Sequence, residues 1–92
     1  MSDRRSVTFF VRDVSGQKAT AVRECPFDAS VGEVVPSVVA LMEMPPRDPD
    51  GNPLSHVLRR DRDGAVLHEA DVVGDVLEED EQCVIQPSID AG

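Results

Sequence analysis

The side chains capable of nucleophilic or acid–base chemistry are few and widely spread. They are two histidines, His56 and His68, and two cysteines, Cys25 and Cys83. An enzymatic nucleophile needs an activating base within reach and a third group that orients this base, and neither histidine lies in a recognisable setting of that kind. The cysteines are too few and too far apart for a disulfide framework or a tetrahedral zinc site. We therefore expect no enzyme, no metal site and no cofactor, and we expect both cysteines to be reduced and half-buried in strands.

The C-terminal segment SIDAG offers the chemistry of a terminal carboxylate. An enzyme that adenylates a carrier protein must thread the carrier's carboxylate into a narrow ATP site, so the carrier needs a slim and flexible end. Gly92 has no side chain to block that approach, and Ala91 has the next smallest one. Apart from Ile89, the residues after Pro87 show no apolar pattern that would hold them to a core. The sequence therefore predicts a flexible tail over residues 88–92, with Gly92 and Ala91 as candidate activation residues.

Length and charge exclude several classes of function. Ninety-two residues suffice for one domain with a modest core. Eighteen acidic and nine basic residues give a formal charge of −9, which repels nucleic acid and anionic membranes. No apolar stretch approaches the roughly 20 residues that cross a bilayer, and the N-terminus lacks the apolar run of a signal peptide. We therefore expect a cytoplasmic protein that binds neither nucleic acid nor membrane.

Periodicity in hydropathy predicts an alternation of strands with one main helix. Ser30 and Glu33 form a capping box ahead of apolar residues spaced three and four apart, which favours a helix; Pro36 would kink it or delay its regular part. In chain order we expect strands at 7–13 and 18–25, a helix at 31–43, strands at 56–60 and 65–67, an acidic turn or short helix at 74–81, and a strand at 82–87.

These elements favour an α+β roll, in which the helix packs across one face of a single mixed sheet. The expected core is almost entirely aliphatic and consists of Phe9, Val11, Val38, Leu41, Val57, Leu67, Leu77 and Ile85. Phe10 is a large apolar side chain on the polar face of its strand, so it is a candidate contact residue.

The chain resembles ubiquitin and the other β-grasp ubiquitin-like proteins over nearly its whole length. FFVRDVSGQKAT is similar to the first hairpin of that family, DASVGEVV to the start of its helix, and DGAVLHEADVVGDVLEEDEQCVIQPSIDAG to its closing third. The resemblance implies a β-grasp domain over residues 7–87, between a flexible N-terminus at 1–6 and the flexible tail. Asp90 and Ala91 depart from the basic tail with Gly-Gly that conjugated members usually carry. The exposed apolar patch by which ubiquitin is recognised has no clear equivalent, apart from Phe10.

The resemblance implies a bacterial ubiquitin-like modifier, of the kind found in antiphage operons, activated at Gly92 and transferred to a target or enzyme. Its implied partners are activating-enzyme-like and conjugating-enzyme-like proteins and a deconjugating peptidase, with Phe10 and Asp90 as candidate contact residues. Two alternatives stay open. One is a non-covalent adaptor, similar to the small ubiquitin-like proteins of type VII secretion, whose acidic surface docks a basic partner. The other is a sulfur carrier with Gly92 as a thiocarboxylate, against which the missing Gly-Gly counts.

Overall fold

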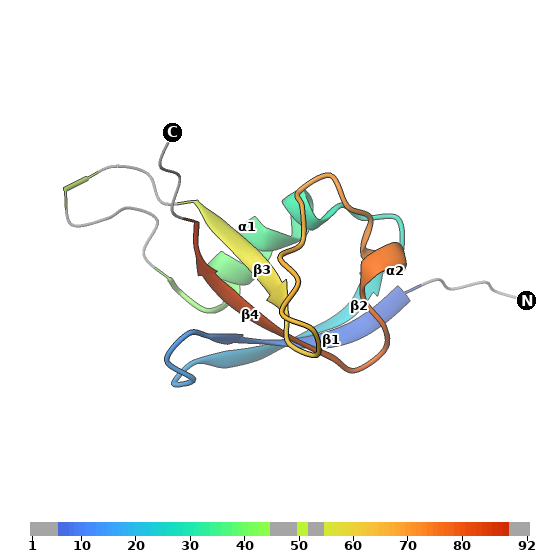
Figure 1. The fold of residues 1–92 in the computed structure, drawn as a ribbon, viewed down its shortest axis with the longest axis horizontal. Coiled ribbons are helices and arrows are strands. Elements are labelled where there is room, and N and C mark those ends of the chain that lie inside the picture. Colours follow the sequence, from blue (N-terminus) through green and yellow to red (C-terminus); the bar gives the residue numbers. More distant parts are fainter. Residues whose placement is uncertain (1–5, 45–49, 52–54, 89–92) are drawn as a thin grey trace, which may run out of the picture.

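The computed structural model describes residues 6–44, 50–51 and 55–88. Figure 1 shows the chain folded as a sheet with a main helix beside it. The elements in chain order are β1 (Ser6–Asp13), β2 (Ala19–Pro26), α1 (Val31–Leu41), β3 (His56–Arg60), α2 (Val73–Val76) and β4 (Glu81–Pro87).

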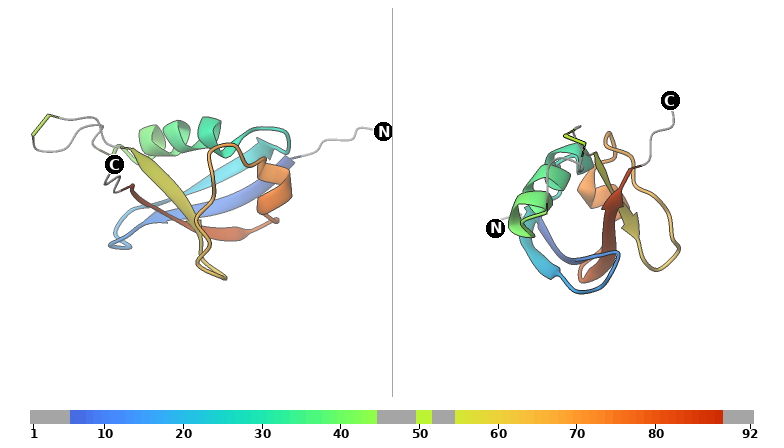
Figure 2. Two further views of the ribbon diagram at one scale, coloured as in Figure 1. Left: turned by 45° about the horizontal axis from the view of Figure 1, so that its top comes forward. Right: turned by 90° about the vertical axis from the view of Figure 1, so that its left-hand side faces the viewer.

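The four strands form one mixed sheet in the order β2-β1-β4-β3. β1 pairs antiparallel with β2 and parallel with β4, and β4 pairs antiparallel with β3. The last strand of the chain therefore lies in the middle of the sheet. α1 crosses one face of this sheet (Figure 2), which confirms the predicted α+β roll.

α1 begins and ends for identifiable reasons. The Oγ of Ser30 accepts a hydrogen bond from the Glu33 amide at 3.2 Å, so Ser30 is the N-cap. The helix continues through Pro36, which lies on its exposed side. Our expected end at residue 43 is wrong, because Glu43 takes a φ of 53° that breaks the helical path, and the regular helix stops at Leu41.

Two of the expected core residues are wrong, and in each case a neighbour takes the position. Leu41 is 59% exposed, because Val38 and Met42, one turn apart, face the sheet and turn Leu41 away from it. Val57 is only half-buried, because the pleat of β3 points Leu58 at the core, opposite Ile85. The expected core residues that are buried are Phe9, Val11, Val38, Leu67, Leu77 and Ile85.

The segment after β3 is less regular than expected. The predicted strand at 65–67 is wrong, because it makes only an isolated bridge between Val66 and Arg59. It still carries Leu67 into the core, since the Leu67 amide donates to the Leu58 carbonyl at 2.8 Å. None of the described helices is long and apolar enough to cross a membrane.

Candidate functional site

Three of the predicted site residues, Asp90, Ala91 and Gly92, lie outside the described residues, which end at Ser88. The structure does show where the chain leaves the sheet. β4 ends at Pro87, opposite His56, and the Ser88 amide donates to the Ser55 carbonyl at 2.8 Å. Because β1 and β4 are parallel, this exit is at the opposite end of the sheet from the start of β1.

Phe10, the fourth predicted site residue, lies on the face of the sheet opposite α1. Its cross-strand neighbours are Ala21 on β2 and Gln82 on β4. Together with Ala19 and Thr20, these residues line a shallow hollow of about 440 Å³. Phe10 is half-buried, so this face offers part of one aromatic side chain rather than a broad apolar area.

The sequence reasoning missed a second feature of this outer face, which is centred on Val84. Val84 is only 2% exposed, although it does not belong to the core cluster beneath α1. Its cross-strand neighbours are Arg12 on β1 and Arg59 on β3, and their aliphatic stems flank it. Arg12 is paired with Asp61 at 3.1 Å, whereas the Nε of Arg59 is buried and has no hydrogen-bond partner among the described residues. The outer face of the sheet therefore carries two arginines on either side of Val84, and Arg12 follows Phe10 on the same face of β1.

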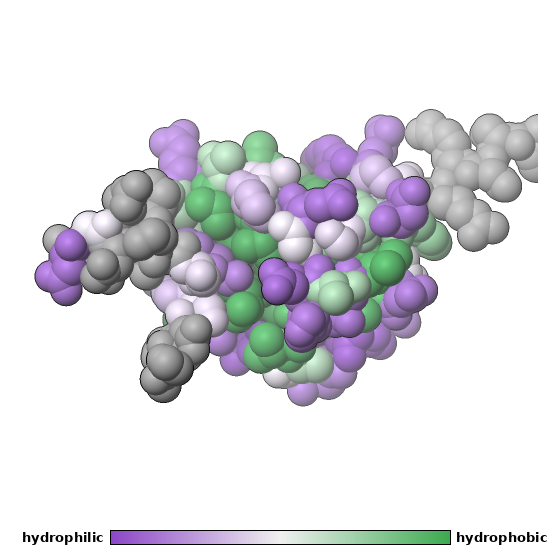
Figure 3. Space-filling view, turned by 90° about the horizontal axis from the view of Figure 1, so that it is seen from above, coloured by the Kyte–Doolittle hydropathy of each residue, from purple (hydrophilic) through white to green (hydrophobic). Residues whose placement is uncertain are grey.

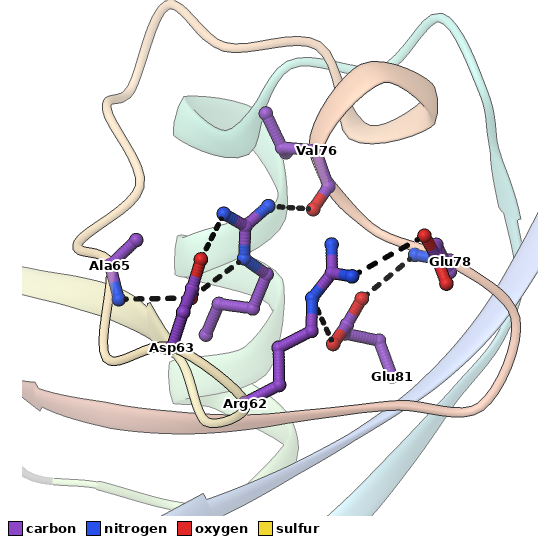
Figure 4. Close-up of polar contacts among 7 residues, drawn as sticks. Arg62, Asp63, Ala65, Val76, Glu78 and Glu81 are labelled. Carbon is purple, nitrogen blue, oxygen red and sulfur yellow. Dashed lines mark hydrogen bonds and ion pairs between the residues drawn. The ribbon is translucent and has the colours of Figure 1, made fainter.

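A group of charged side chains closes the connection between β3 and β4 (Figure 4). Arg60 donates to both carboxylate oxygens of Asp63, at 3.0 and 2.7 Å, and the Ala65 amide donates to the same carboxylate at 3.2 Å. These hydrogen bonds lower the pKa of Asp63 to about 2, and those from Arg60 have the largest effect. Nearby, Arg62 lies 3.4 Å from the buried carboxylate of Glu81. These pairs hold the turn after β3 against β3 and β4.

The thiols and imidazoles lie in settings that do not activate them. Burial raises the pKa of Cys83 to about 12 and also raises the pKa of Cys25, so both thiols stay protonated near neutral pH. Burial lowers the pKa of His56, and the Nδ1 of exposed His68 accepts a hydrogen bond from the Ala70 amide at 3.0 Å. Among the described residues, no group of three or more His, Cys, Asp or Glu side chains could hold a metal ion.

Comparison with known proteins defines the class of fold. No family model matches the chain, and no curated protein matches its sequence. Among solved structures, it is similar to Caldiarchaeum subterraneum ubiquitin, with a TM-score of 0.66 and 19% identity over 95% of this chain and 99% of that one. It is also similar to a structure described as "Molecular Mimicry of SUMO promotes DNA repair", with a TM-score of 0.63 and 15% identity over 96% of each chain. The chain therefore has the ubiquitin-like β-grasp fold that its sequence resembles.

Proposed function

We propose that this chain is a ubiquitin-like protein modifier of a bacterial conjugation system, activated at the carboxylate of Gly92 and joined to a target or an enzyme. The observation that carries the proposal is a ubiquitin-like fold whose central strand, β4, releases the chain at the rim of the sheet. Ser88 is held there by a hydrogen bond from its amide to the Ser55 carbonyl, beside the start of β3. Gly92 and Ala91 have the smallest side chains available, which suits entry into a narrow ATP site.

The chemistry of activation would belong to the partners. They would be an activating enzyme that adenylates the carboxylate, a conjugating enzyme that transfers it and a peptidase that removes it, acting in the cytoplasm, where ATP is available. Phe10 and Asp90 are the proposed contact residues on this chain. Asp90 is acidic, so we expect the surface that receives the tail to be basic at that position. Antiphage defence is the proposed setting.

Linkage of this modifier to a lysine of a second copy would be limited to one side chain. Lys18 is the only lysine. Its ammonium donates to the carbonyls of Met42 and Glu43, at 3.2 and 3.5 Å, at the C-terminal end of α1. Cations at this end of a helix are stabilised by the helix dipole. Attack by Lys18 on an activated carboxylate would break these contacts, so we propose that chains of this modifier linked through lysine do not form.

The test is conjugation in the native host. We would place an epitope tag at the N-terminus, because β1 starts at the opposite end of the sheet from the exit of β4. We would then compare the wild-type chain, a Gly92 deletion and Ser88→Ala. Ser88→Ala removes a hydroxyl but keeps the backbone amide that bonds to Ser55, so it is the matched control. We expect tagged species of higher mass with the wild type and with Ser88→Ala, and none with the deletion. Conjugates or biological activity that survive deletion of Gly92 would overturn the proposal.

A non-covalent adaptor is the second candidate, and the formal charge of −9 favours it because an acidic surface attracts basic partners. The same experiment separates the two, since an adaptor keeps its partner and its activity without Gly92.

A sulfur carrier would differ from both. With sulfide and an activating enzyme, its mass would increase by the difference between sulfur and the carboxylate oxygen that it replaces.

A further inference from the structure

An apolar groove separates α1 from the outer edge of β3. It has a volume of about 700 Å³. Three α1 residues, Val35, Pro36 and Val39, form one wall, and the segment that contains Val66 and Leu67 forms the other. Figure 3 looks onto this side of the molecule and shows apolar side chains along its middle with polar ones around them. Val35 and Val39 are only partly covered by the core, so apolar surface is accessible here.

The walls of this groove are held in place by backbone hydrogen bonds. The first amides of α1 donate to the opposite wall, from Gly32 to the Glu69 carbonyl at 2.9 Å and from Val31 to the Asp71 carbonyl at 2.8 Å. The Leu67 amide fastens the same segment to the Leu58 carbonyl of β3 at 2.8 Å. The groove therefore exists before anything binds, and binding would not require the walls to become ordered.

The floor of the groove includes a stretch of the β3 edge that no described residue pairs. The Leu58 carbonyl and the Arg60 amide bond to the 65–67 segment, so the even-numbered residues of β3 turn their backbone groups away from β4. By the same alternation, the amide and carbonyl of His56 and the amide of Leu58 face outward. No described residue makes a backbone hydrogen bond to these three groups. An open edge of this kind is a template for an added strand.

Charge decides between the possible occupants. Glu69 lines the groove, and no lysine or arginine lines it among the described residues. Burial lowers the pKa of His56, which also lines the groove, so it stays neutral near pH 7. A second copy of this chain would bring another net charge of −9, which disfavours self-pairing. A segment with basic residues would be attracted instead.

We propose that this groove binds an extended segment of a partner protein. The segment pairs with the edge of β3 at His56 to Leu58 and lays alternate aliphatic side chains against Val35 and Val39. It carries arginine or lysine next to these aliphatic residues. In such a strand every second side chain faces α1, so the recognised pattern is aliphatic at alternate positions. This binding goes beyond the proposed conjugation, because it does not use the carboxylate of Gly92.

The test uses a synthetic peptide of the proposed pattern, acetyl-RKVTVSVTV-amide, titrated into ¹⁵N-labelled full-length chain. Two matched peptides are a scramble that loses the alternation and a version with glutamate in place of Arg-Lys. We expect amide shift changes at His56, Leu58, Val35 and Val39. We also expect binding at least about fivefold weaker for both matched peptides and for the original peptide at high salt.

Protein variants locate the binding to the groove. Val35→Lys places a charge on the apolar wall and should weaken binding by about tenfold or more. The control is Leu41→Lys on the exposed side of the same helix, which should bind normally. Glu69→Arg changes an exposed side chain, so it tests the role of charge even if Val35→Lys fails to fold. This variant should bind the basic peptide more weakly and the acidic peptide more tightly than the wild type does.

Three results would overturn the proposal. The first is no binding at about 1 mM peptide. The second is shift changes confined to the outer face around Phe10. The third is equal binding by Glu69→Arg and the wild type. Concentration-dependent dimerisation, with the same shift changes in the absence of peptide, would assign the groove to a second copy of the chain and would also overturn it.

Discussion

The backbone amide of Ser88 donates to the carbonyl of Ser55 at 2.8 Å, so the residue after β4 is hydrogen-bonded to the residue before β3. This hydrogen bond predicts a boundary in hydrogen exchange. The Ser88 amide should exchange more slowly than the amides of Ile89 to Gly92, and deletion of Gly92 should leave the thermal midpoint unchanged. Amide exchange followed by NMR checks both expectations. Protected amides beyond Ser88 would mean that the tail docks on the domain, contrary to our prediction of a flexible end.

The N-cap of α1 should contribute measurably to stability. Ser30→Ala removes the oxygen that accepts from the Glu33 amide, so the free energy of unfolding should fall by about 1 kcal/mol. The control is Ser37→Ala, which removes the same hydroxyl from an exposed position inside the helix and should change stability little. Urea denaturation measures both. Equal losses in the two variants would contradict the capping role.

The cysteines should be unreactive in the folded protein. Because burial raises the pKa of Cys83 to about 12, little thiolate forms at pH 8, and its side chain is only 1% exposed. Cys25 should behave similarly, since burial raises its pKa as well. Labelling with a disulfide reagent should therefore be slow in native buffer and complete for both thiols in denaturant. A rapidly labelled thiol in native buffer would reveal an activated cysteine, against the absence of enzymatic chemistry that we expect.

Asp63 should make stability depend on pH in acid. Its pKa in the folded chain is about 2, below the ordinary aspartate value of 3.8, so the stability that Asp63 contributes is fully present above the pKa of the unfolded chain. The contribution is lost as pH falls from about 4 to about 2. Asp63→Asn should therefore unfold with a shallower pH dependence than the wild type in this window. Denaturation at several pH values compares the two proteins, and identical slopes would argue against the Arg60–Asp63 pair as the cause.

Local patterns predicted the fold well, because each main element has its own local signal. The sequence shows the alternation of Val7, Phe9 and Val11 and the cap at Ser30 without any knowledge of the segments that pack against them. The errors arose where a choice depends on packing. Leu41 and Met42 suit a helical stripe equally, and Val57 and Leu58 are equally apolar, so only the position of the sheet decides which residue of each pair is buried.

The candidate sites depended even more on contacts between distant residues. The burial of Val84 between Arg12 and Arg59 requires the strand order, in which β4 lies between β1 and β3. The groove requires α1, β3 and the segment near Glu69 to meet, and no local pattern encodes that meeting. A hydropathy alternation in β4 that places Val84 outward was the one signal that could have shown the first of these features.

Intact mass spectrometry of the purified chain, incubated with ATP and a candidate activating enzyme from the native host, tests the proposed modifier function most directly. The wild-type chain should form an adenylate, a thioester, an oxyester or a conjugate through its C-terminal carboxylate, and the Gly92 deletion should form none of them. An unchanged mass for the wild-type chain under these conditions, together with full biological activity of the Gly92 deletion, would contradict the modifier function.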